Sequence, residues 1–154
     1  MEPIKELNID ANYHNEAKLS KHLTYFKLLL EEIRKRKIAD LNAGYVNQHI
    51  DELNHFKGSV KALKKILRKN KNLILRMLEK DHNITPKNYY RNKWMGIGML
   101  IYGVSFGVIF SSILGNYAFV GVGLPIGMVL GMAIGANKDN KAKEQGNQLD
   151  IETS

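Results

Sequence analysis

Residues 94–136 read WMGIGMLIYGVSFGVIFSSILGNYAFVGVGLPIGMVLGMAIGA, and this stretch decides the fold. From residue 94 to residue 137, 44 positions contain no Asp, Glu, Lys, Arg or His. A helix needs about 20 apolar residues to cross a bilayer. Because the stretch is about twice that length, it predicts two spans, at about 94–114 and 117–136. Gly115-Asn116 is the expected turn between them, since both residue types tolerate positive φ.

Basic residues flank the pair of spans, and the connecting turn has no charge. The basic flanks are Arg91, Lys93, Lys138, Lys141 and Lys143. Basic flanks remain in the cytoplasm, so both termini are predicted to lie on the cytoplasmic side of the bacterial inner membrane. The aromatic residues expected at the interface are Tyr89, Tyr90 and Trp94.

Glycine recurs every four residues in both spans and gives each helix a face without large side chains. In the second span the repeat is Gly123, Gly127, Gly131 and Gly135. In the first span it is Gly103, Gly107, Ser111 and Gly115. Small residues let helices in lipid approach closely. The stripes therefore predict packing either between the two spans of one chain or between protomers around a central pathway. We favour the second arrangement, a symmetric homo-oligomer, because Gly96, Gly98 and Gly121 lie outside the stripes.

Pro125 lies inside the second span. Proline lacks the backbone N–H and crowds the carbonyl four residues earlier, here that of Gly121. A bend is expected at this point, either static or serving as a hinge for gating.

The polar part of the chain has a helical pattern, so the predicted fold class is all-α. Residues 1–14 show no sustained period and are expected to form a loose arm. Residues 15–88 are expected to form a basic cytosolic hairpin or small bundle, because apolar residues recur at spacings of three and four. Residues 89–137 then form the transmembrane hairpin, and residues 138–154 a cytosolic tail. The apolar positions of the bundle are Leu19, Leu23, Phe26, Leu30, Ile33, Val46, Ile50, Leu53, Val60, Leu63, Leu67, Ile74 and Leu78.

Positive charge is concentrated in two clusters of the polar part. The first cluster is Arg34, Lys35, Arg36 and Lys37. The second cluster contains Lys57, Lys61, Lys64, Lys65, Arg68, Lys69 and Lys71, and no acidic residue occurs between residues 57 and 76. On one helix, Lys57, Lys61, Lys64, Arg68 and Lys71 would share a stripe. Such a stripe predicts binding of a polyanion such as nucleic acid, attraction to anionic lipid, or a merely solvated face.

Composition excludes several kinds of chemistry. The chain has 154 residues, a net charge of +8 and no cysteine, so it has no disulfide, thiolate nucleophile or cysteine-bound metal. Its histidines do not cluster at metal-ligand spacing, and we expect them at the surface. They are His14, His22, His49, His55 and His82. No catalytic triad, P-loop or carboxylate pair stands out, so we expect no enzymatic activity, metal or cofactor.

Two resemblances add to these expectations. The stretch GLPIGMVLGMAIGANKDNKAKEQGNQLDIE, residues 123–152, resembles the C-terminal part of small bacterial glycine-zipper two-span membrane proteins. In layout, a basic helical segment followed by two glycine-rich spans also resembles the channel effector of the Hailong anti-phage defence system. This second resemblance implies a tetrameric channel that is held closed by single-stranded DNA oligomers, which a partner nucleotidyltransferase produces. It assigns no role to individual residues, because no motif matches position by position.

Together these observations predict an oligomeric membrane ion channel or pore. An anionic ligand, for which single-stranded DNA is the candidate, would bind the basic helices and bias the open or closed state. The resemblance implies a role in anti-phage defence. The alternative is a membrane anchor or scaffold that recruits a protein partner or binds anionic lipid. The expected partners are a second copy of the chain, membrane lipid, single-stranded nucleic acid and an enzyme that makes the ligand.

Overall fold

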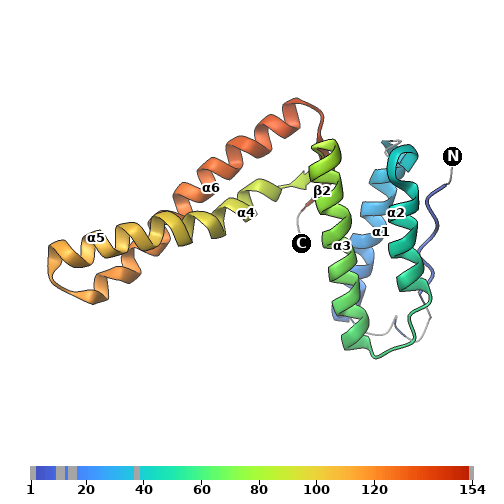
Figure 1. Cartoon of the computed structure of the whole chain (residues 1–154), viewed down its shortest axis with the longest axis horizontal. Helices are drawn as coiled ribbons and strands as arrows, with labels where there is room; N and C mark the ends of the chain where they lie inside the picture. Colours follow the sequence, from blue (N-terminus) through green and yellow to red (C-terminus); the bar gives the residue numbers. More distant parts are fainter. Residues whose placement is uncertain (1–2, 10–12, 14–16, 37–38, 153–154) are drawn as a thin grey trace. The chain divides into compact units, whose positions relative to one another are not determined.

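The computed structural model describes residues 3–9, 13, 17–36 and 39–152, and it divides into two compact units at His82 (Figure 1). The helices of the first unit are α1 (Ala17–Lys35), α2 (Ala39–Asn54) and α3 (Val60–His82). The second unit contains β1 (Thr85–Lys87), α4 (Tyr89–Gly98), the π-helical turn η2 (Met99–Gly103), α5 (Val104–Leu114), the 3-10 turn η3 (Tyr117–Phe119), α6 (Val120–Glu144) and β2 (Gln148–Glu152).

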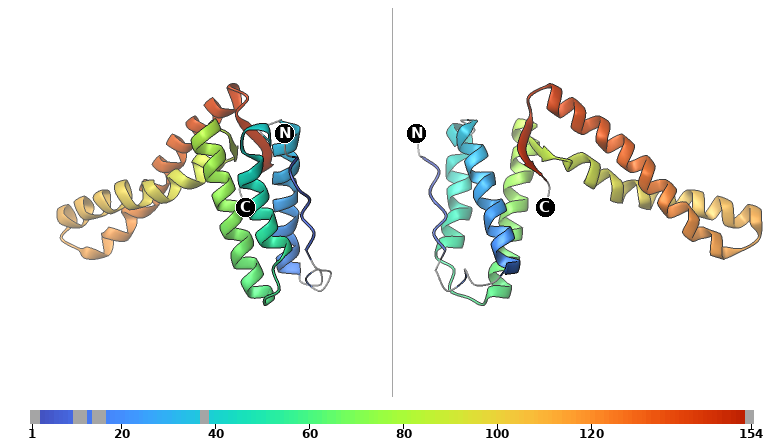
Figure 2. Two further views of the ribbon diagram at one scale, coloured as in Figure 1. Left: turned by 45° about the vertical axis from the view of Figure 1, so that its right-hand side comes forward. Right: turned by 180° about the vertical axis from the view of Figure 1, so that it is seen from behind.

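The first unit is a three-helix bundle in which α3 contacts both α1 and α2 (Figure 2). The predicted apolar positions form its core: all are buried except Val60, which is half-buried. Gly58 and Ser59 separate α2 from α3, so the second apolar pattern belongs to two helices. Helix α3 ends at His82, shortly before Thr85-Pro86, because the residue before a proline avoids helical geometry.

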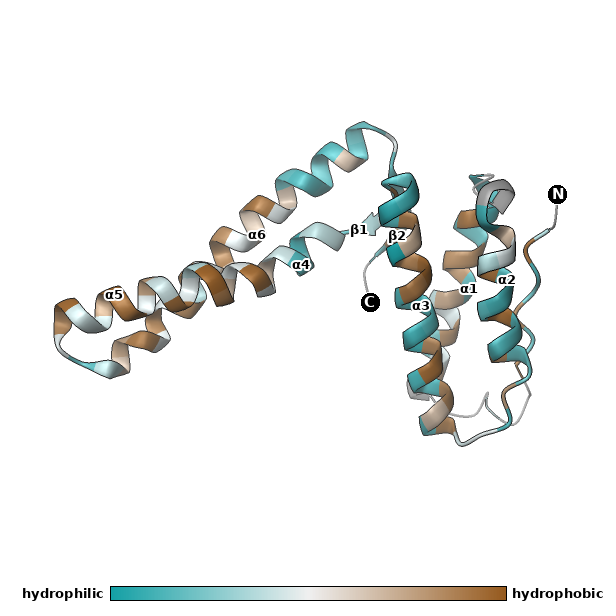
Figure 3. Cartoon of the chain, in the orientation of Figure 1, coloured by the Kyte–Doolittle hydropathy of each residue, from teal (hydrophilic) through white to brown (hydrophobic). Residues whose placement is uncertain are grey.

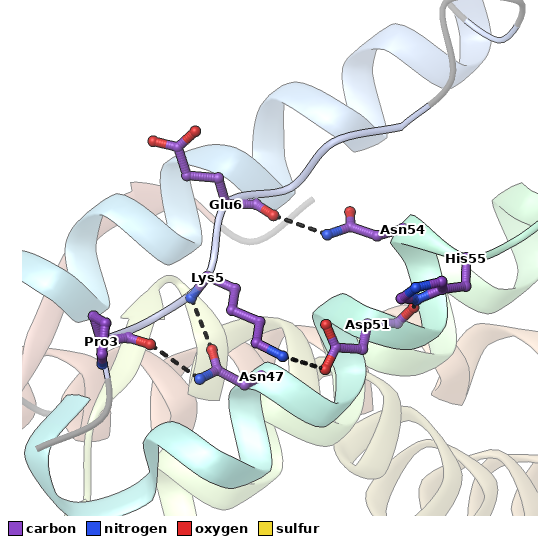
Figure 4. A network of polar contacts seen from close by, with 7 residues as sticks. All are labelled: Pro3, Lys5, Glu6, Asn47, Asp51, Asn54 and His55. Carbon is purple, nitrogen blue, oxygen red and sulfur yellow. Dashed lines mark hydrogen bonds and ion pairs between the residues drawn. The ribbon is translucent and has the colours of Figure 1, made fainter.

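Residues 3–9, which we expected to be loose, bind along α2 (Figure 4). The Lys5 backbone N–H donates to Asn47 Oδ1 at 2.8 Å, and Asn47 Nδ2 donates to a carbonyl of the segment at 3.0 Å. Lys5 Nζ also pairs with Asp51 at 2.7 Å. The buried side chains of the segment are Ile4 and Leu7. An extended segment held by such hydrogen bonds has no helical period, which is why the sequence pattern missed it.

The second unit is a helical hairpin whose base is closed by two strands. Its two helices, Tyr89–Leu114 and Tyr117–Glu144, are long and apolar enough to cross a membrane. Apolar residues predominate in α5 and the adjoining half of α6, whereas the last turns of α6 are polar (Figure 3). Helix α6 extends to Glu144, past the predicted end of the span at residue 136. Strands β1 and β2 pair in parallel, so the all-α prediction was incomplete.

The turn at the tip of the hairpin follows the prediction at one residue and departs from it at the other. Gly115 has φ +64° and ends α5 in the left-handed conformation. Asn116 is extended instead, with φ −140°, and its side chain accepts a hydrogen bond from the Ala118 N–H at 2.9 Å. Helix α6 continues through Pro125, and a hinge at that residue stays a prediction.

Candidate functional site

One face of α3 carries a group of basic side chains, which we call the basic face. Its members are Lys61, Lys64, Lys65 and Arg68, and none of them makes an ion pair with any residue that the structure describes. Their spacing of three and four places them on one side of the helix. The opposite side is apolar and packs in the bundle. With Lys69 and Asn72 the basic face lines an open hollow of about 520 Å³.

Two acidic side chains of α2 pair with cations that lie outside the basic face. Glu52 of α2 pairs with Lys69 at 3.4 Å, so the edge of the face toward α2 is partly neutralised. Asp51 pairs with Lys5 of the N-terminal segment. The cations of the basic face therefore repel one another without local compensation, which disfavours such a cluster unless an anion binds it.

The first predicted cluster, residues 34–37, has other partners. Arg34 Nη2 donates to the Lys5 carbonyl at 2.7 Å and so holds the N-terminal segment. Lys35 and Arg36 pair with Glu32 at 3.1 and 3.9 Å. Lys37 lies outside the described residues. The Lys57 backbone precedes the first residue of α3, so Lys57 does not belong to the helical stripe.

The edge of the basic face toward α1 contains His22, which the sequence analysis treated as an ordinary surface residue. Burial lowers the pKa of His22, and the charges of Lys64, Lys71 and Arg68 lower it further. Lys71 Nζ lies 4.9 Å from the ring centre of Tyr25, one turn beyond His22 in α1. A helical wheel of α1, with His22 and Tyr25 flanking the apolar positions, would have placed both at the edge of the buried side of the helix.

A buried polar pair lies between α2 and α3. His49 is only 8% exposed, so its expected place at the surface was wrong. Asn70 is fully buried, and its Nδ2 donates to the His49 carbonyl at 3.2 Å. The Tyr45 ring contacts the His49 ring edge-on at 4.7 Å between centroids. Burial lowers the pKa of His49, so the neutral imidazole is the form that the bundle accommodates.

Acidification is therefore expected to destabilise the bundle. The unfolded chain protonates His49 near pH 6.5, whereas the folded chain does so only at lower pH. Stability is thus complete above pH 6.5 and falls as the pH decreases through the folded pKa, by at most about 1.4 kcal/mol per pH unit for this one proton. Thermal unfolding of the full chain followed by circular dichroism between pH 7.5 and 5 measures this. His49→Gln should flatten the dependence, and the same change at exposed His55 should leave it; equal slopes in both variants would contradict the assignment.

The two glycine stripes face each other inside one hairpin. A Cβ at Gly123 would lie 2.6 Å from Gly107 Cα, and one at Gly135 would lie 2.5 Å from Arg91 Cα. A Cβ at Gly127 would lie 2.5 Å from the Gly98 carbonyl oxygen. These are backbone atoms, which cannot rotate aside, so only glycine permits the observed helix separation.

Gly98 belongs to this contact although it is five residues before Gly103. The π-helical turn η2 lies between them and inserts one extra residue. Both glycines therefore face α6: a Cβ at Gly98 would lie 2.5 Å from Gly131 Cα, and one at Gly103 would lie 2.9 Å from Leu124 Cα. We had placed Gly98 outside the stripes and used it to favour an oligomer. The prediction was wrong for Gly98, because spacing by four ignores the π turn, whereas Gly96 and Gly121 do lie outside the contact, with nothing within 4 Å of their Cβ positions.

The remaining polar residues of the hairpin are also accounted for within the chain. Ser105 and Ser112 donate to the carbonyls of Ile101 and Val108 in their own helix, at 2.7 and 2.9 Å. Ser111 is buried, as its place in the stripe requires. Gly115 is exposed and forms the turn rather than the contact. The structure thus favours the first of the two alternatives, packing between the spans of one chain.

Asp139 secures the base of the hairpin and was missed by the sequence analysis. Its carboxylate is buried, and Oδ1 and Oδ2 accept hydrogen bonds from the backbone N–H groups of Tyr90 and Arg91 at 3.0 and 2.9 Å. These N–H groups belong to the first turn of α4, where Asn88 provides no side-chain cap. A helix N-terminus favours a carboxylate. The signal was the glycine period itself, since residue 139 follows Gly135 by four.

Aromatic rings and cations adjoin Asp139. Lys138 Nζ lies 5.0 Å from the ring centre of Trp94 and 5.7 Å from that of Tyr90. Lys93 Nζ lies 5.5 Å from the ring centre of Tyr89. Rings and cations at this level suit a membrane–water interface.

No protein family, curated protein or solved structure matches the chain. Within the described residues, no three His, Asp or Glu side chains form a group that would hold a metal ion.

Proposed function

We propose that the chain is a membrane-anchored, nucleic-acid-binding protein. The hairpin holds it in the bilayer, with both termini on the cytoplasmic side, and the basic face of α3 binds single-stranded nucleic acid through its phosphates. The observation that carries the proposal is the set of four cations on one helix face without an acidic partner in the described part of the chain.

Exposed side chains of the hairpin support the anchor. The outward surfaces of both helices are aliphatic over the distal part, where the glycine stripes are turned inward. The main exposed aliphatic residues are Leu100, Ile101, Val108, Ile109, Ile113, Leu114, Val122, Val129 and Leu130. Such surfaces are stable in hydrocarbon, where a helix satisfies most of its backbone polar groups through its own hydrogen bonds.

The bundle favours a nucleic acid over a lipid surface. Interfacial helices insert an apolar face into the membrane, but the apolar face of α3 is buried in the bundle. Lys61 and Arg68 are seven residues apart, about 10 Å along the helix, so the basic face is long enough to contact more than one phosphate of a strand. Tyr25 is buried, so it offers no ring for base stacking. Recognition is therefore of the backbone, independent of base sequence and strongly salt-dependent.

Neutralising the basic face is expected to weaken nucleic-acid binding by about 30-fold or more at moderate salt. The variant is Lys61→Gln, Lys64→Gln, Arg68→Gln in the full chain, held in nanodiscs of zwitterionic lipid. Each lost phosphate contact reduces the salt slope by about 0.7 for a single strand, so three should reduce it by about 2. Anisotropy of a labelled 20-nucleotide oligothymidylate at several salt concentrations measures both quantities.

A second triple variant provides the matched control. Lys27→Gln, Lys80→Gln, Lys143→Gln lowers the net charge equally, on exposed residues outside the basic face. Its binding should remain close to that of the unaltered chain. An equal loss in both variants would mean that net charge alone drives binding, and would overturn the proposal. Binding to vesicles of anionic lipid without binding to the oligonucleotide would assign the face to membranes instead.

The ion channel expected from the sequence stays a prediction. Because the glycine stripes are occupied within one hairpin, a pore would have to form between the outward faces of several hairpins, and these are mainly aliphatic. Ion flux from proteoliposomes, with and without oligonucleotide, measures it directly. The anchor predicts no flux in either case.

A further inference from the structure

We infer that the bound strand lies over the α1 edge of the basic face, where His22 completes the site and takes up a proton as the anion binds. This inference rests on the proposed function and specifies which edge is used and how binding responds to pH. His22 lies on α1, outside the cluster that the sequence analysis assigned to the ligand.

The two edges of the basic face differ in charge. Toward α2, Glu52 pairs with Lys69 at 3.4 Å, and its carboxylate would repel a phosphate. Toward α1, Lys71 Nζ lies 4.9 Å from the ring centre of Tyr25, one turn beyond His22. Within the described residues, the charges that lower the pKa of His22 are those of Lys64, Lys71 and Arg68. A polyanion that follows α3 therefore gains by covering the α1 edge and avoiding the α2 edge.

Proton uptake at His22 follows from this arrangement. In the free protein, burial and the three cations of α3 hold the pKa of His22 below its usual value. Within α1, Tyr25 stays neutral because burial raises its pKa to about 12, and Lys21 adds one more positive charge next to His22. A phosphate beside Lys64 and Arg68 offsets these charges and favours the imidazolium. By linkage, affinity must then increase as the pH falls.

The test measures the affinity of a labelled oligothymidylate without a terminal phosphate, at pH 8.0 and 5.5 and constant ionic strength. Phosphodiesters and thymine do not titrate in this range, so the group that takes up the proton belongs to the protein. The full chain in zwitterionic nanodiscs should bind more tightly at pH 5.5, with a gain of no more than about tenfold per pH unit for one proton. His22→Gln should lose this gain, and His22→Lys should bind tightly at both pH values.

His55→Gln is the matched control, because His55 is an exposed histidine of the turn that follows α2 and does not belong to the basic face. It should retain the full pH response. A pH response that persists in His22→Gln would overturn the inference while the proposed function stands. Absence of oligonucleotide binding by the unaltered chain at both pH values would instead reject the proposed function. Circular dichroism of each variant at both pH values shows that the helices are intact.

Discussion

Substitution of Gly127 by leucine is expected to separate the two helices of the hairpin, while the same substitution at Gly121 is expected to leave them packed. A Cβ at Gly127 would lie 2.5 Å from Gly103 Cα and from the Gly98 carbonyl oxygen. Neither atom can move without its whole helix, so the contact opens along several turns. We expect a destabilisation of about 3 kcal/mol or more, at the upper end of the range for overpacking.

Gly121 provides the control because nothing lies within 4 Å of its Cβ position. It lies in the same helix, and leucine is a better helix former than glycine. Gly121→Leu should therefore change stability by less than about 0.5 kcal/mol or increase it slightly. Equal destabilisation by the two substitutions would mean that the stripes do not form the contact.

Trp94 is a native probe for this experiment, since it is the only tryptophan of the chain. Its carbonyl carbon lies 2.9 Å from the Cβ position of Gly131, one turn beyond Gly127, and its ring faces Lys138 at 5.0 Å. Opening the hairpin removes both contacts and changes the emission. Titration of the full chain in mixed micelles with SDS, followed by this emission, gives the midpoint for each variant.

The sequence was sufficient for those features that depend on periodicity. Spacings of three and four among Leu19, Leu23, Phe26 and Leu30 predicted the buried side of α1, because a helix repeats every 3.6 residues. The absence of charge from residue 94 to residue 137 predicted the hairpin, and Gly115 its turn. In each case the signal is local, so tertiary contacts were not needed to find it.

Features that depend on backbone hydrogen bonds between distant residues were missed. The pairing of Thr85 with Gln148 in the two-stranded sheet joins residues far apart in sequence and has no local signal. The same holds for the contact of Lys5 with Asn47. The π turn was missed for another reason: it changes the helical period, so Gly98 falls on the interacting face only when one residue is inserted.

The arrangement of the basic residues could be predicted in part. Clustered charge predicted Lys61, Lys64 and Arg68 as ligand-binding residues, and the structure places them on one face. The cluster at Arg34 looked equivalent in sequence, and only the fold shows that Arg34 holds a neighbouring segment. A charge run does not reveal which of its members meet an acid or a carbonyl after folding, and this decides which remain available for a ligand.

Asp139→Ala is expected to weaken the hairpin at its base by about 2 kcal/mol, because it removes a buried acceptor of two charge-assisted hydrogen bonds. The N–H groups of Tyr90 and Arg91 would then lack their partner. Asp139→Asn retains one acceptor oxygen and should give an intermediate loss. Hydrogen exchange of the Tyr90 and Arg91 amides should accelerate in the order Asp, Asn, Ala, and the Trp94 emission midpoint should fall in the same order.

Asp150→Ala is the comparison, since Asp150 also pairs near the base, with Lys87, but its side chain is 77% exposed. An exposed ion pair contributes between about 0 and 1 kcal/mol to stability, so this variant should be nearly neutral. An equal effect of the two alanine substitutions would contradict the role given to Asp139.

The role of Asp139 extends beyond these two hydrogen bonds. A slide of α6 by one residue displaces Asp139 by about 1.5 Å along the helix axis, which breaks both hydrogen bonds and misaligns every glycine with its counterpart. The carboxylate thus fixes the register in which the two stripes can meet.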